Sequence, residues 1–209
     1  MVVVRLPPPT GGISPQFTVL EPNTKLLRIF DPTRHNATAL GFRYYGPISR
    51  FDHQQSDSGK PNINKNRGIL YFGFSLSCCL VEIFGDSRTI EIREQHVAIV
   101  TLTKSLKLLD LRGVAAMRAG TVAAVSAITQ RDISQAWGRY FYEHQEFYAE
   151  IDGLIFSGAH NGEDAISLYE RAISVLSVAE VQELPLKHPD LVQPILEIAE
   201  NHNLLVMNS

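Results

Sequence analysis

Gly68–Gly85 reads GILYFGFSLSCCLVEIFG, and it is the part of the chain that says most about the fold. Its first part, Gly68–Phe74, is a compact apolar run with the length of a β-strand. Ser75 follows at a position suited to an N-cap, and the apolar residues after it predict a helix that ends near Gly85. The stretch therefore predicts a strand, a cap and a helix in direct succession.

Further strands and helices are predicted on both sides of this stretch. Short apolar runs typical of strands occupy residues 25–30, 90–92, 97–102, 106–111 and 151–158. Helical spacing of apolar residues is found over 132–144 and 189–201, where Pro194 is acceptable only in a first turn. The polar run 51–67 predicts an exposed, mobile loop, and whether its part 52–67 forms a lid is left open. Several adjacent strands imply a sheet.

Composition limits the class of protein. A chain of 209 residues with 44% hydrophobic and 20% charged residues is long enough to bury one core. The net charge of -3 offers no excess of cations for a direct nucleic-acid partner. Met1–Leu6 runs into prolines and lacks the centre of a signal peptide, and no apolar run is long enough to span a bilayer. Cys78 and Cys79 are neighbours, so we expect a reduced, cytoplasmic protein without a membrane partner.

Three regions are predicted along the chain. Residues 1–24 are expected to form a flexible N-terminal arm, because Pro7–Pro15 is rich in Pro and Gly. Residues 25–180 are expected to form the domain, and residues 181–209 a C-terminal helical extension packed on it. No internal repeat indicates a second domain.

Arginine and aromatic residues are concentrated in the first quarter of the chain. After Arg28 comes Gly41–Phe51, which reads GFRYYGPISRF and contains Arg43 and Arg50. Arginine makes planar, bidentate contacts with phosphate, and tyrosine offers a flat ring for stacking. Together they suit a dinucleotide. No zinc spacing and no glycine-rich phosphate loop is present, so no metal is expected.

The order of five short segments resembles the RES domain, over about residues 25–178. The segments are Leu27-Arg28-Ile29, Ser49-Arg50-Phe51, Leu70-Tyr71, Glu82 inside an apolar helix, and Gly153-Leu154-Ile155-Phe156-Ser157. The resemblance implies a single α+β domain with a mixed, ADP-ribosyltransferase-like sheet flanked by helices. It also implies NAD+ as substrate, with cleavage of the nicotinamide–ribose bond and transfer of ADP-ribose to phosphate (NAD+ phosphorylase) or water (NAD+ glycohydrolase). Many members are toxins that deplete NAD+, arrest growth and are paired with an antitoxin carrying a helix-turn-helix domain. A homo-oligomer is left open.

The resemblance also assigns roles to residues. The catalytic set is Glu82, Arg28 and Ser157, and the set expected to bind the dinucleotide is Arg28, Arg50, Tyr71, Arg43 and Ser157. Glu82 would offset positive charge on the ribose, the arginines would hold pyrophosphate or incoming phosphate, Tyr71 would stack, and Ser157 would orient the ribose or amide. Arg43 competes with Arg50, which we favour because its Arg-Phe setting resembles the family.

Each of these residues also has a structural interpretation. An acid in the helical setting of Glu82 usually faces solvent or pairs with a structural arginine. The structural alternative for Arg28 is an ion pair inside the fold. Ser157 fits the end of a strand and Tyr71 a core position, while His53 and His160 stay outside the predicted set. Ser49 stands where the family often has glycine, and the loop 52–67 is long. Two other functions are kept: a protein-modifying ADP-ribosyltransferase and an inactive RES-fold binding module.

Overall fold

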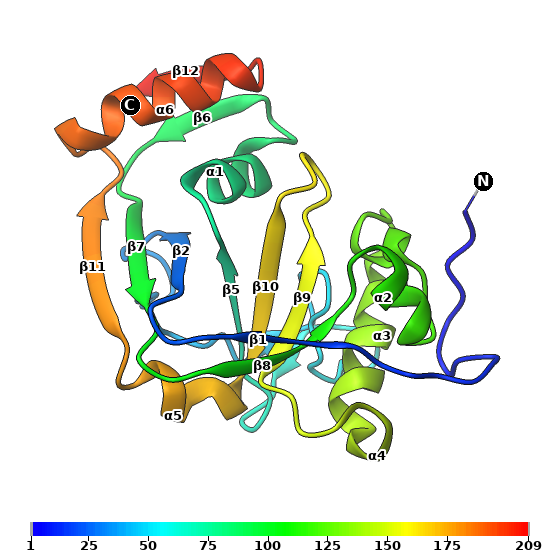
Figure 1. Cartoon of the computed structure of the whole chain (residues 1–209). Helices are drawn as coiled ribbons and strands as arrows, with labels where there is room; N and C mark the ends of the chain where they lie inside the picture. Colours follow the sequence, from blue (N-terminus) through cyan, green and yellow to red (C-terminus); the bar gives the residue numbers. More distant parts are fainter. Residues whose placement is uncertain (1, 209) are drawn as a thin grey trace.

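An eight-stranded mixed sheet lies at the centre of residues 2–208, which the computed structural model describes (Figure 1). Its strands lie in the spatial order β1 (Phe17–Leu20), β8 (Leu106–Asp110), β9 (Gly153–Ser157), β10 (Asp164–Tyr169), β5 (Ile69–Gly73), β2 (Lys25–Phe30), β7 (His96–Thr101) and β11 (Glu180–Pro185). Neighbours are antiparallel except β8 and β9, which are parallel. A mixed sheet with separate helices confirms the predicted α+β class.

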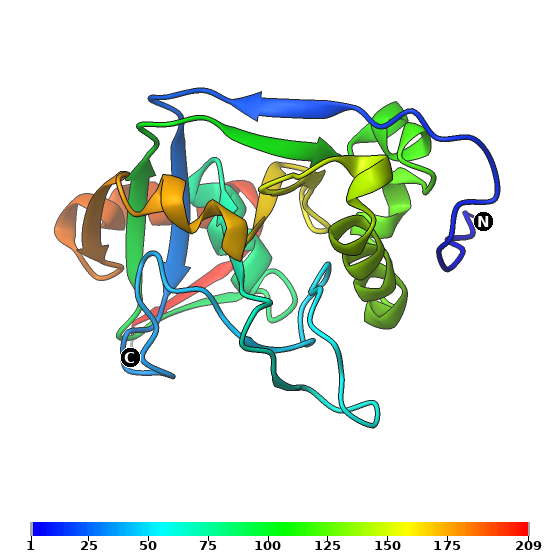
Figure 2. The same cartoon turned by 90° about the horizontal axis from the view of Figure 1, so that it is seen from below.

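Two small sheets and several helices surround the main sheet. The small sheets pair β6 (Thr89–Ile92) with β12 (Leu205–Asn208), and β3 (Tyr45–Gly46) with β4 (Asn62–Ile63). The helices are α1 (Leu76–Phe84), α2 (Gly113–Arg118), α3 (Arg131–Glu143), α4 (Gln145–Tyr148), α5 (Ile173–Leu176) and α6 (Pro189–Asn201), with short 3-10 helices η1 (Ala123–Ser126) and η2 (Glu170–Ala172). Figures 1 and 2 show α2, α3 and α4 as one group beside β9, while α1 and α6 form a second group with β6 and β12.

The predicted succession of strand, cap and helix is confirmed. Ser75 has extended backbone and its hydroxyl accepts a hydrogen bond of 2.8 Å from the amide of Cys78, as an N-cap does. The helix α1 ends at Phe84 and is followed by Gly85. One face of the helix is buried, which fixes the direction in which the opposite face, with Glu82, points.

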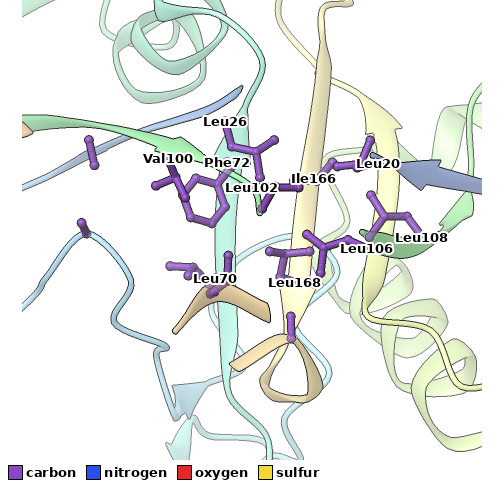
Figure 3. Packing of buried hydrophobic residues seen from close by; sticks show 14 of the residues in the cluster. Leu20, Leu26, Leu70, Phe72, Val100, Leu102, Leu106, Leu108, Ile166 and Leu168 are labelled. Atoms are coloured by element: carbon purple, nitrogen blue, oxygen red, sulfur yellow. The ribbon is translucent and has the colours of Figure 1, made fainter. Parts of the chain in front are cut away.

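The core has three parts. On one face of the sheet, residues from seven strands and the turns beside them pack together, including Leu20, Leu26, Leu70, Phe72, Val100, Leu102, Leu106, Leu108, Ile166 and Leu168 (Figure 3). A second cluster joins α3 and α4 to β9 through Trp137, Phe141, Tyr148 and Phe156. A third joins α1 and α6 to β2 and β7 through Ile29, Leu80, Val97 and Ile195. Each helix group therefore covers its own part of the sheet.

The ends of the chain are more integrated than predicted. Within the expected flexible arm of residues 1–24, β1 pairs with β8, and the Trp137 indole donates a 2.7 Å hydrogen bond to the carbonyl of Arg5. In the expected extension of residues 181–209, α6 packs in the third core cluster, and β11, which begins at residue 180, forms an edge of the main sheet. Both strands pair with strands that are distant in the sequence, and amino-acid composition does not predict such pairing.

Two local predictions were wrong. The run 51–67 was expected to be exposed, and residues 55–60 are, but Phe51, Asp52, His53 and Gln54 are buried, where Asp52 Oδ2, His53 Nε2 and Gln54 Nε2 have hydrogen-bond partners inside the protein. Pro194 lies inside α6 and not in its first turn. Proline has no N–H and so cannot donate the helical hydrogen bond at this position. The helix is nevertheless held to the protein by its buried residues Ile195 and Ala199. None of the helices within residues 2–208 combines the length and the apolar character needed to cross a membrane.

Candidate functional site

The sheet brings Ser157 and the start of α1 to the same edge. Both β5 and β9 are antiparallel to β10, so they run in the same direction and their carboxyl ends lie together. In register, Gly73 and Phe156 both face Ala165 of β10 from opposite sides. Because α1 begins just after β5, the helix is positioned beside the turn that follows Ser157 (Figure 1).

The carboxylate of Glu82 lies against the main chain directly after Ser157. A Cβ atom placed on Gly158 would be 2.6 Å from Glu82 Oε1, which shows how closely the two approach. The side chain of Glu82 is 28% exposed, and its oxygen also lies 3.4 Å from His160 Nδ1. The structure thus brings Glu82 beside the residue that directly follows Ser157 in the sequence.

Arg50 lies in a turn between α3 and β5. Its turn is held by α3: Arg131 donates to the carbonyl of Ile48 at 3.2 Å, and Gln135 to that of Ser49 at 3.1 Å. The buried Nε of Arg50 has no hydrogen-bond partner within the described residues. His160 in the first place, with smaller contributions from Arg131 and Arg50, lowers the pKa of Asp86. The charge of Arg50 thus acts on the turn that follows α1, and its buried Nε lacks a partner within the described residues.

Tyr71 connects the Arg50 turn to β5. Its hydroxyl donates to Asp52 Oδ1 at 2.7 Å and also contacts the carbonyl oxygen of Arg50. Burial, followed by the charge of Asp52, raises the pKa of Tyr71 well above its usual value. Tyr71 is consequently a neutral donor that connects the Arg50 segment to the centre of the sheet. Stacking of its ring on the substrate stays a prediction.

Asp52 is a site residue that the sequence did not reveal. Its carboxylate accepts from Arg43 at 2.8 and 2.9 Å and from the amides of Ile48 and Ser49 at 2.6 and 2.7 Å. Asp52 is fully buried, and with the Tyr71 hydroxyl both of its carboxylate oxygens accept hydrogen bonds. Arg43 is thereby neutralised, whereas Arg50 is not. The available signal was Phe51, an apolar residue at the start of a polar run.

Arg28 lies apart from Glu82. On β2, Leu27 and Ile29 pack toward α1, whereas Arg28 alternates with them and points to the opposite face. Its Nη1 donates to the carbonyls of Thr38 and Ala39 and, at 3.3 Å, to that of Gly41, and no ion pair involves it within residues 2–208. Burial and then the nearby charge of Arg43 lower the pKa of Arg28 to about 10. The predicted convergence of Arg28 with Glu82 is not found.

A surface hollow lies beyond the other end of α1. It is lined by Ile29, Phe30, Asp31, Arg34, Ile83, Phe84, Glu91, Arg93 and Gln95. Its arginines pair with its own carboxylates, Arg34 with Asp31 and Arg93 with Glu91. None of the predicted site residues lines it. No group of His, Cys, Asp or Glu suited to a metal ion occurs in the part of the chain that the structure describes.

Comparison with known proteins finds a similar curated protein and a similar solved structure. A curated relative, the probable toxin y4kH of Sinorhizobium fredii (strain NBRC 101917 / NGR234), is 34% identical over 90 residues, which cover 42% of this chain and 67% of the relative. A chain in the crystal structure of the M. tuberculosis MbcT-MbcA toxin-antitoxin complex has a similar fold, with a TM-score of 0.53 and 16% identity, over 84% of this chain and 90% of that chain.

The family model of the RES domain matches residues 25–188. This match starts at the first residue of β2 and ends three residues after β11, so it includes the corner formed by Arg50, Tyr71, Glu82 and Ser157. It covers well over half of the sequence, and the chain therefore belongs to the RES domain family.

Proposed function

We propose that this chain is a RES-type toxin that cleaves the bond between nicotinamide and ribose in NAD+ and so depletes cellular NAD+. The observation that carries the proposal is the contact of the Glu82 carboxylate with Gly158, directly after Ser157. In this proposal Glu82 supplies a carboxylate, Ser157 a hydroxyl and Arg50 a guanidinium, the groups that a cationic ribose and its phosphates need. The family assignment supports the same reaction.

The chemistry requires stabilisation of positive charge. In NAD+ the nicotinamide is a cationic pyridinium, and it leaves with the electron pair of the C–N bond as a neutral molecule. The ribose then carries oxocarbenium character. Glu82 offsets this charge and accepts a hydrogen bond from a ribose hydroxyl. No general acid is needed for departure of the nicotinamide, and none is assigned.

The remaining residues bind and orient the substrate. Arg50 donates to the pyrophosphate through its guanidinium. Ser157 orients the nicotinamide ribose, and Tyr71 with Asp52 keeps the Arg50 turn in place. Arg28 holds the segment 38–41, and its buried charge without a carboxylate partner favours an anion nearby. Arg43, paired with Asp52, is proposed to support this arrangement and not to bind substrate.

An acceptor completes the reaction. An oxygen of water or of inorganic phosphate forms the new bond to the anomeric carbon. Water loses its proton to solvent in this step, and phosphate yields ADP-ribose phosphate. Both products follow from the same nicotinamide cleavage, so the proposal covers NAD+ glycohydrolase and NAD+ phosphorylase activity.

A protein partner is also proposed. The similar curated protein is a probable toxin, and the similar structure is that of a toxin-antitoxin complex. We therefore infer that a cognate antitoxin, expected to carry a helix-turn-helix domain, binds this chain. Co-expression with the protein encoded beside it would reveal a complex on size-exclusion chromatography.

The direct test is NAD+ cleavage by the purified chain. We expect nicotinamide release by the wild type and a loss on the order of a hundredfold in Glu82→Gln, because removing one electrostatic stabiliser of a transition state has this size of effect. Glu94→Gln, at an exposed carboxylate paired with Lys187, is the matched control and should keep full activity.

Product analysis with and without phosphate separates the acceptors. ADP-ribose indicates water, and ADP-ribose phosphate indicates phosphate. Label from NAD+ on a protein band in a cell extract would replace the proposal by protein ADP-ribosylation. NAD+ that stays intact with wild type and variants alike would contradict any enzyme and favour an inactive RES-fold module.

A further inference from the structure

His160 lies between two carboxylates at the proposed catalytic corner. Its Nδ1 is 3.4 Å from Glu82 Oε1, and its Nε2 is 3.0 Å from Asp86 Oδ1. Gly85, between those two acids, leaves room for the ring, because a Cβ atom there would be 2.7 Å from His160 Cδ2. The imidazole therefore bridges the end of α1 and the turn after β9, and one of its partners is Glu82 itself.

The other charges around this ring are also defined. Arg50 and Arg131 also act on Asp86, since their charges contribute to the lowering of its pKa. Glu163, on the same turn as His160, is held by Ser77 and Asn161 at 2.6 Å and by Ser75. The carboxylates that contact the ring directly are thus Glu82 and Asp86.

We propose that His160 is a positioning residue for Glu82, which it holds when protonated and releases when neutral. The inference rests on the proposed function, because Glu82 is its target. It is supported by contacts on both ring nitrogens, and only an imidazolium donates at both. The side chain of His160 is 24% exposed, so it exchanges protons with solvent.

Protonation should weaken catalysis by Glu82. The imidazolium donates to Glu82 Oε1 and places a positive charge beside the carboxylate, which then compensates less of the charge on ribose. A neutral ring keeps one N–H, and the shorter contact favours Asp86 as its acceptor. Nδ1 then turns a lone pair toward Glu82, whose oxygen becomes free for a ribose hydroxyl.

An NMR titration tests the contact without any need for NAD+ cleavage. Partial burial opposes protonation of His160, but Asp86 and Glu82 outweigh it and raise its pKa above 6.5. We expect the His160 signal, assigned by its loss in His160→Gln, to titrate at a lower pH in Glu82→Gln and in Asp86→Asn. A titration unaffected by Glu82→Gln would overturn the inference.

The kinetic test compares kcat/KM for NAD+ from about pH 5.5 to about pH 8.5. We expect the wild-type value to rise on the order of tenfold through the titration of His160, an effect of about 1.4 kcal/mol. His160→Gln should lack this rise and exceed the wild type at the acid end. His144→Gln, which alters another histidine beside a glutamate, should keep the wild-type profile.

Two results separate this inference from the proposed function. A wild-type profile retained in His160→Gln, or a uniform loss at every pH in that variant, would overturn the role of His160 while leaving NAD+ cleavage established. A wild-type chain that leaves NAD+ intact at every pH counts against the proposed function, and the NMR titration still decides the contact.

Discussion

At the level of single residues, Gly158 determines how closely Glu82 approaches the end of β9. Oε1 of Glu82 is the far end of a flexible side chain, so a methyl group on residue 158 displaces the carboxylate more easily than the backbone. The carbonyl of Glu163, 3.1 Å from the same Cβ position, limits the space on the other side. A side chain added at residue 158 should therefore affect the position of the Glu82 carboxylate more than the stability of the fold.

Gly158→Ala is expected to reduce NAD+ cleavage by at least about tenfold, because a small misplacement of a catalytic group costs much of its effect. Stability should fall by about 1 kcal/mol, the lower end for added volume in a packed site. Urea unfolding and nicotinamide release, measured on the same preparation, check both values. Gly12→Ala is the control, since nothing lies within 4 Å of its Cβ position. Unaltered cleavage in Gly158→Ala would show that Glu82 tolerates displacement.

The predicted residues differ in how well the sequence located them. Glu82, Ser157, Arg50 and Tyr71 were predicted to gather; the structure places Glu82 against Gly158, directly after Ser157, and links Tyr71 to the Arg50 carbonyl, while the shared site itself stays a prediction. Arg28 was not placed correctly, because strand alternation sends it to the face opposite α1. Asp52 and His160 needed three-dimensional neighbours to be recognised, since a carboxylate in a polar run and a lone histidine are usually exposed.

At the level of elements, α1 is anchored at its beginning by Glu163. The Ser75 hydroxyl caps the helix and contacts Glu163, which also accepts from Ser77 and Asn161 at 2.6 Å. Partial burial opposes ionisation of Glu163, but these hydrogen bonds outweigh it and lower its pKa below 4.5. The turn after β9 thus holds both ends of α1, through Glu163 and through His160.

Ser75→Ala is expected to cost about 1 kcal/mol of stability, the usual effect of losing an N-cap.

The contribution of Glu163 to stability should be present above pH 4.5 and decline as the pH falls through its lowered folded-state pKa. Urea unfolding of wild type and Glu163→Gln from about pH 6 to about pH 3 should therefore show a difference that shrinks in acid. A difference that grows in acid would contradict the hydrogen bonding described.

Elements with a strong local pattern were predicted from the sequence. The strand β5, the capped helix α1 and the amphipathic helix α3 each carry their own signal, and they lie within a few residues of the predicted bounds. The strands β1 and β11 carry no local signal of this kind. Their pairing with β8 and β7 depends on partners at least 79 positions away in sequence, which no local pattern encodes.

At the level of the whole molecule, the main sheet opens between β2 and β5. These strands share the register pair Leu27↔Gly73, and within residues 2–208 no other register pair joins them. Beyond this pair the chain leaves β2, forms the Arg43–Asp52 segment and returns to β5. Arg43 pairs with Ile69 at the start of β5, and the Tyr71 hydroxyl from the middle of that strand contacts Arg50 and Asp52, so the segment is held along β5 where β2 has separated from it.

The most direct test of the central claim is a crystal structure of the Glu82→Gln variant with NAD+ bound. The glutamine keeps the shape of Glu82 but removes its charge, so the dinucleotide should stay intact. We predict the nicotinamide ribose beside residue 82 and Ser157, with the pyrophosphate toward Arg50. NAD+ bound in the hollow lined by Asp31 and Glu91, or at any place away from Ser157 and Arg50, would contradict the account.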